Sequence, residues 1–219
     1  GKRGVGGRLA TRHHGSGLVF DTATQLFTAS HPSFRALCEV WERQGWIARY
    51  SGRIVRLLVG VGQTSVVQEE TCTPSSSPIF VAVGGMERLA GRLAEALREG
   101  GAVGVRTQMW ASAVEQTPDR RWDVKWDLWS MGVADYLVLA HNGKCANRLA
   151  SAPGLKHCLG ALRGLRLRAL WSLAVVFEDP LGLPFDAGAV EACPVLSWVG
   201  NQANRSDSVI GADATRAEC

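Results

Sequence analysis

The sequence predicts a protein of mixed α and β structure, of the α/β or α+β class. Apolar residues recur at helical spacing through residues 85–99. Residues 122–128 alternate between apolar and charged side chains, as expected of a half-buried antiparallel hairpin. The apolar runs at residues 134–140 and 170–177 predict strands with both faces covered, as in a parallel sheet. Helical and strand patterns therefore mix along the whole chain.

Turn and capping signals place the remaining elements. His31-Pro32-Ser33 predicts the start of a helix that ends at Gly45, because proline is tolerated in a first helical turn. Gly100-Gly101 ends the helix of residues 85–99. Strands are expected within residues 18–29, 46–60 (with a turn at Ser51-Gly52), 79–83, 103–110 and 195–199, a loop at 71–78, and a helix through Ala146 and Leu149.

Composition narrows the class of protein. The chain has 219 residues, of which 46% are hydrophobic and 20% charged, as in globular proteins. The six cysteines include no C-x-x-C pair and the histidines no paired spacing, so we expect neither a metal site nor a disulfide framework. The longest apolar run, residues 170–177, is far shorter than the roughly 20 residues that span a bilayer, so no transmembrane segment is expected.

Positive charge gathers at the start of the chain. The net charge is +4, and residues 1–12 contain four basic and no acidic residues. Basic residues among glycines predict a local anion site. Nucleic-acid binding is not expected, because it would need a further basic cluster with aromatic partners. The basic residues Arg163, Arg166 and Arg168 alternate with leucines, which favours a half-exposed face over a basic patch.

The motif Arg3-Gly4-Val5-Gly6-Gly7-Arg8 carries the strongest chemical signal. Its glycines let the backbone adopt positive φ and approach a ligand, and exposed N–H groups in such a turn cradle phosphate oxygens. Arginines add charge-assisted donors. A solvated basic tail is the alternative, and composition leaves both open. The candidate residues for a nucleotide pyrophosphate are Arg3, Gly4, Gly6, Gly7, Arg8, Thr11 and Arg12.

Four ordered segments resemble amine-oxidase-like and renalase-like FAD-dependent oxidoreductases. R-G-x-G-G-R-x-x-T-R resembles the segment that follows the second strand of their nucleotide-binding fold. Residues 20–29 (FDTATQLFTA) resemble their F-D-x-x-A-Q-[YF]-F-T-A, which lies along the flavin, and residues 83–86 resemble V-G-x-x-G-M. Residues 140–149, 177–181 and 196–198 look like a plant-type branch of the group. The resemblance covers most of residues 1–200.

The resemblance implies an activity and further site residues. It implies FAD as cofactor and hydride transfer to it from a small reduced substrate, such as an amine or NAD(P)H. It also implies a chloroplast location. Gln25 matches the glutamine near the flavin, although a strand residue with a satisfied amide is the alternative. Trp110 matches a residue whose backbone contacts the adenine, although a buried core tryptophan fits equally well.

Departures from the family leave a second hypothesis open. These 219 residues contain neither the opening strand with G-x-G-x-x-G nor the acidic residue that holds the ribose, and the closing C-terminal part is absent after about Gly200. Thr22 and Thr24 replace the usual histidine and alanine of the flavin-facing strand. We therefore expect an incomplete FAD clamp. The alternative to an enzyme is a non-catalytic remnant that serves as a binding or assembly subunit with a protein partner.

The same resemblance predicts two interleaved domains. Residues 1–45 and 85–153 would form the remainder of an FAD-binding domain around a partial Rossmann-like sheet. Residues 46–84 and 154–219 would form a substrate-binding domain around a mixed or antiparallel sheet.

Overall fold

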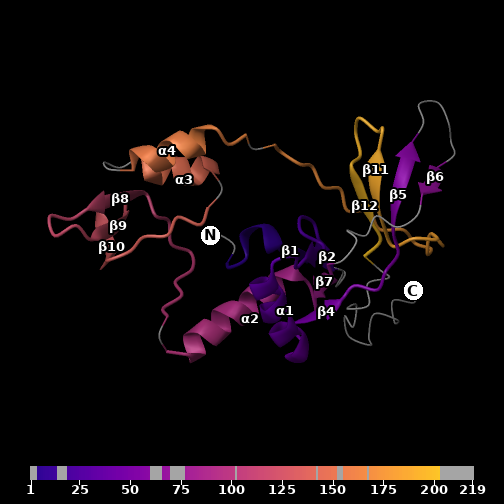
Figure 1. Ribbon diagram of the computed structural model, residues 1–219, viewed down its shortest axis with the longest axis horizontal. Coiled ribbons are helices and arrows are strands. Elements are labelled where there is room, and N and C mark those ends of the chain that lie inside the picture. Colours follow the sequence, from indigo (N-terminus) through magenta and orange to yellow (C-terminus); the bar gives the residue numbers. More distant parts are fainter. Residues whose placement is uncertain are drawn as a thin grey trace. The chain divides into compact units, whose positions relative to one another are not determined.

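The computed structural model confirms the mixed α/β class and divides the chain into two compact units (Figure 1). It describes residues 4–13, 19–59, 66–69, 77–101, 103–141, 143–151, 155–166 and 168–202. The larger unit comprises Val5–Val105 and Ser172–Cys219, and the smaller unit comprises Gly1–Gly4 and Arg106–Trp171.

The core of the larger unit lies between a small antiparallel sheet and two helices. The sheet has the order β3 (Phe27–Thr28), β7 (Ile79–Ala82), β4 (Ile47–Arg49). The helices are α1 (Pro32–Arg43) and α2 (Met86–Glu99), both where the sequence predicts them. The buried cluster contains Ala29, Cys38, Trp41, Ile47, Phe80, Ala82, Met86 and Leu89.

Two further groups of strands complete the larger unit. The 3-10 turn η1 (Gly7–Leu9) leads into a hairpin of β1 (Thr11–His13) and β2 (Val19–Asp21), in which Thr11 is opposite Asp21. A second sheet has the order β12 (Trp198–Gly200), β11 (Ala187–Glu191), β5 (Ile54–Val59), β6 (Val66–Glu69). Among the described strands, only β5 and β11 pair in parallel.

The smaller unit consists of a three-stranded meander and two short helices. Its strands are β8 (Ala113–Gln116), β9 (Trp122–Trp126) and β10 (Trp129–Ala134), all antiparallel. The helices are α3 (Gly143–Ala150) and α4 (Lys156–Arg163). The alternating pattern of residues 122–128 thus correctly predicted an antiparallel hairpin, and the helix through Ala146 and Leu149 is confirmed as α3.

Three strand predictions were wrong. Strand β10 ends at Ala134, and residues 135–140 and 170–177 form no strand. Their side chains are not covered either, since Tyr136 is 90% exposed and Trp171 is 99% exposed. Residues 103–110 also form no strand. An apolar run indicates a segment suited to burial, but a strand forms only where another backbone accepts its hydrogen bonds.

The division into cofactor and substrate domains stays a prediction. The sheet β3-β7-β4 combines residues 27–28 with residues 47–49 and 79–82, which the sequence assigned to different domains. Most of the predicted loop at 71–78 lies outside the described residues. No helix within the described part of the chain is long and apolar enough to cross a bilayer.

Candidate functional site

The glycine–arginine motif forms a tight turn with left-handed backbone. Gly4 and Gly6 each have φ of 100°, and Gly7 has φ of 54°. The N–H of Leu9 donates to the carbonyl of Gly6 at 2.9 Å and closes the turn. Side chains rarely adopt these φ values, so the glycines are required by the conformation, as the sequence predicted.

One side of this turn is open and the other packs against α2. A Cβ placed on Gly4 or Gly7 would meet no atom within 4 Å, whereas a Cβ on Gly6 would lie 3.0 Å from the Cβ of Ala90. Gly7 and Arg8 are exposed. The backbone of the turn is therefore accessible to a ligand at Gly7, while Gly6 allows close packing on the helix.

Two of the three candidate arginines, Arg8 and Arg12, lie within the described residues. Arg8 and Arg12 are exposed, and neither pairs with a carboxylate among the described residues. Arg3 lies outside the described residues. Arg8 directly follows Gly7 in the turn, and it offers the positive charge that an anionic ligand needs.

Thr11 is buried and hydrogen-bonded to other residues of the protein. Its hydroxyl donates to Oδ1 of Asp21 at 2.6 Å and accepts the N–H of Glu87 at 3.0 Å. Its own N–H donates to Oε2 of Glu87 at 3.3 Å. Thr11 is only 7% exposed. It therefore ties β1 to the first turn of α2, and its proposed contact with a cofactor stays a prediction.

Asp21 caps helix α2 from a distant part of the chain. The N–H of Met86 donates to both carboxylate oxygens, at 3.1 and 3.2 Å, and Asp21 is 2% exposed. The residue at the N-cap position, Gly85, has no side chain to do this. A carboxylate at a helix N-terminus satisfies a free N–H and interacts favourably with the helix dipole. Sequence analysis missed this residue, although it lies in the F-D motif.

We expect Gly85→Ala to destabilise the larger unit by about 1–3 kcal/mol. Gly85 has φ of 100° and ψ of 151°, a region open essentially only to glycine. An added Cβ would also lie 3.0 Å from Oγ1 of Thr11. Urea denaturation followed by circular dichroism measures the change.

Gly91→Ala in the same helix is the matched control. A Cβ at Gly91 meets no atom within 4 Å, and alanine favours a helix interior over glycine by roughly 0.5–1 kcal/mol. The two substitutions should therefore change the free energy of unfolding in opposite directions. Equal effects would show that the backbone at Gly85 is not constrained as described.

Gln25 is held by residues near the end of the described chain. Its Oε1 accepts the indole N–H of Trp198 at 3.0 Å. Beside it, the Gln202 side chain accepts the N–H of Asp21 at 2.8 Å and donates to the carbonyl of Asp21 at 3.2 Å. Residues 198–202 thus lie along residues 21–25. The acceptor of Gln25 is satisfied within the protein, as the alternative interpretation of this residue expected.

A small cleft opens beside Gln25. Its cavity volume is about 10 Å³, which is room for about one water molecule. A flavin ring does not fit this cleft without movement of its walls. Its lining residues are Gln25, Leu26, Tyr50, Val81, Asp186, Ala187, Asn201 and Gln202.

Trp110 belongs to the smaller unit. The guanidinium of Arg148 lies 4.9 Å from its ring centroid, and Nη2 of Arg148 donates to the carbonyl of Ala111 at 3.0 Å. The alternative of a buried core tryptophan is wrong, because Trp110 is 49% exposed. Its backbone contact with an adenine stays a prediction.

Two cysteines have shifted pKa values. The N–H groups of Leu196 and Val195 lower the pKa of the Cys193 thiol, and the Leu196 nitrogen lies 3.3 Å from its sulfur. Burial, with a smaller contribution from Glu42, raises the pKa of Cys38. The described residues contain no cluster of three His, Cys, Asp or Glu side chains that could hold a metal ion.

No protein-family model matches the chain. The resemblance to amine-oxidase-like and renalase-like flavoproteins therefore rests on the sequence motifs described above.

Proposed function

We propose that this chain is part of an FAD-dependent oxidoreductase of the amine-oxidase and renalase type. The observation that carries the proposal is the open glycine turn followed by two exposed arginines, Arg8 and Arg12, which pair with no carboxylate among the described residues. Exposed N–H groups and charge-assisted donors of this kind suit a dinucleotide pyrophosphate. When bound, the flavin would accept a hydride from a small reduced substrate, such as an amine or NAD(P)H.

The residues present fit this cofactor in part. The turn offers accessible backbone at Gly7 and positive charge at Arg8, which suits the pyrophosphate. The region of Gln25 is less suitable, because its acceptor already holds Trp198 and the adjoining cleft is small. We therefore expect this 219-residue chain to bind FAD weakly or not at all, and a micromolar or tighter complex would contradict that expectation.

Arg8→Ala tests the role of the turn. Because a hydrogen bond to a charged group contributes about 1.5–3 kcal/mol, the substitution should weaken FAD binding roughly ten- to a hundredfold. Titration followed by flavin fluorescence measures the affinity, and absorbance after desalting shows whether flavin is retained. Arg43→Ala, an exposed arginine of α1, is the matched control and should leave the affinity unchanged. Equal affinities of Arg8→Ala and the original chain would exclude this turn as the pyrophosphate site.

A second candidate function is a non-catalytic binding or assembly subunit. The bond between Gln25 and Trp198 favours it, because this bond occupies the polar atom expected to face a flavin. For a subunit of this kind we expect no FAD binding even at saturating FAD. Arg8→Ala should then have no effect in the titration. A measurable FAD affinity that Arg8→Ala weakens would therefore favour the flavoprotein over this candidate.

A further inference from the structure

Helix α2 holds the glycine turn at two points. Before the turn, the backbone of Gly6 lies so close to α2 that a Cβ on Gly6 would be 3.0 Å from the Cβ of Ala90. After the turn, Thr11 is hydrogen-bonded to Glu87. Glu87 and Ala90 are three residues apart, so they lie on the same face of the helix. The exposed residues of the turn lie between these two points along the chain.

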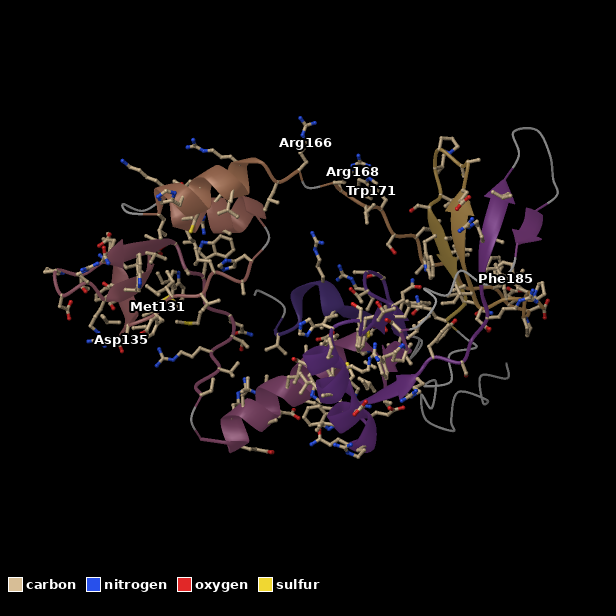
Figure 2. The ribbon with its side chains drawn as sticks, in the orientation of Figure 1. Met131, Asp135, Arg166, Arg168, Trp171 and Phe185 are labelled. Atoms are coloured by element: carbon tan, nitrogen blue, oxygen red, sulfur yellow. The ribbon has the colours of Figure 1, made fainter. Side chains whose placement is uncertain are left out.

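Glu87 binds Thr11 with both its backbone and its side chain. The Thr11 hydroxyl accepts the N–H of Glu87 at 3.0 Å, and the N–H of Thr11 donates to Oε2 of Glu87 at 3.3 Å. The same hydroxyl donates to Asp21 on β2, so side chains of β1, β2 and α2 meet at the start of the helix (Figure 2). The Glu87 carboxylate thereby satisfies a main-chain donor of a buried residue.

We propose that Glu87 is a positioning residue for the ligand-binding turn. Its carboxylate fixes Thr11, and through Thr11 it fixes the exposed backbone at Gly7 and Arg8 in the conformation that receives an anion. The inference rests on the proposed function, since it takes this turn as the pyrophosphate site. Recognition by a preformed site loses less conformational entropy on binding than recognition by a loose one, so a fixed turn binds its ligand more tightly.

The short chain between Thr11 and the turn passes this constraint on. Only Ala10 separates Thr11, the first residue of β1, from Leu9, the last residue of η1. The N–H of Leu9 closes the turn by donating to the carbonyl of Gly6 at 2.9 Å, and the N–H of Ala10 lies 3.3 Å from the carbonyl of Gly7. A displacement of Thr11 therefore acts directly on the hydrogen bonds that define the turn.

The chemistry of the Glu87 side chain allows its two properties to be separated. Glutamine keeps an acceptor oxygen and loses the negative charge, whereas alanine loses both. Both residues are good helix formers. If Glu87 acted only through its charge at the start of α2, the two substitutions would have the same effect. If it acts as the acceptor for Thr11, only alanine should loosen the turn.

Amide hydrogen exchange of the full chain tests the hold of Glu87 on the turn. In Glu87→Ala, exchange at Leu9 and Thr11 should become about tenfold faster, because Thr11 loses its acceptor. Exchange at Met86 should change much less, because Asp21 still accepts its N–H. Glu87→Gln should keep slow exchange at Leu9.

Three results of this measurement would overturn the inference. One is unchanged exchange at Leu9 in Glu87→Ala. Another is the same acceleration in Glu87→Ala and Glu87→Gln, which would assign the effect to charge. The third is equal acceleration at Leu9 and Met86 in Glu87→Ala, which would mean that the start of α2 is destabilised as a whole. Circular dichroism of each variant verifies that the fold is retained.

Titration with inorganic pyrophosphate, followed by the amide chemical shifts of Gly7 and Arg8, connects the turn to its ligand. Glu87→Ala should bind pyrophosphate about tenfold more weakly than the original chain, and Glu87→Gln should bind it at least as tightly. Glu95→Ala, at an exposed glutamate of the same helix, is the matched control and should leave the affinity unchanged.

The two measurements distinguish failure of this inference from failure of the proposed function. Equal pyrophosphate affinities of Glu87→Ala and the original chain would overturn the inference and leave the turn as the pyrophosphate site. The absence of pyrophosphate binding to every form of the chain would count against the proposed function. Exchange at Leu9 would still confirm or refute the hold of Glu87 on the turn.

Discussion

Phe80→Ala is expected to lower the free energy of unfolding of the larger unit by about 3–5 kcal/mol. Phe80 is fully buried on β7, the middle strand of the sheet β3-β7-β4. Its ring centroid lies 5.7 Å from that of Phe27. Removing the ring loses its transfer from water and leaves a cavity at the centre of the core. Urea denaturation followed by far-ultraviolet circular dichroism measures the loss.

Phe34→Ala is the control for this prediction. Phe34 also contacts Phe27, with ring centroids 6.0 Å apart, but it is 36% exposed. Because water can fill part of the space left by its ring, the cost should be well below that of Phe80→Ala. Equal costs for the two substitutions would mean that β7 does not occupy the centre of the core.

One helix and one hairpin show what the sequence could predict about the fold. Helix α2 was found from its own periodicity, and β9 with β10 from their alternation, because these patterns are local. The runs at 134–140 and 170–177 have equally clear apolar patterns but form no covered strand. Whether such a run is covered depends on a partner, and the run itself does not specify one.

In the candidate site, too, local features were predictable from the sequence and long-range contacts were not. The positive φ of Gly6 and Gly7 was predictable, since it follows from the residue type. The partners of Gln25 and Thr11 were not, because Trp198 is 173 residues from Gln25 and Glu87 is 76 residues from Thr11. The cap of α2 also comes from 65 residues away. The one local indication of a distant cap is Gly85, which provides no capping side chain at the position where one is usual.

Asp21→Ala is expected to destabilise the larger unit by about 2–4 kcal/mol. The carboxylate accepts the N–H of Met86 and the hydroxyl of Thr11, and both bonds are buried. Alanine would leave these two donors without an acceptor. Leaving a buried polar group unsatisfied costs about 1–3 kcal/mol, more when the lost partner is charged. Urea denaturation gives the total change, and hydrogen exchange of the Met86 amide reports the loss of the cap directly.

Glu95→Gln on the same helix is the matched control, because Glu95 is exposed and neutralising it should change stability by less than about 0.5 kcal/mol.

Comparing Asp21→Ala with Glu95→Gln also tests whether the glycine turn depends on the cap of α2. Gly6 packs on α2 at Ala90, and Thr11 joins β1 to Glu87 of the same helix. If Asp21 holds the start of α2 against β1, its loss should speed hydrogen exchange at Leu9 as well as at Met86, while Glu95→Gln should speed neither. Faster exchange at Met86 alone would mean that the turn keeps its shape independently of the cap.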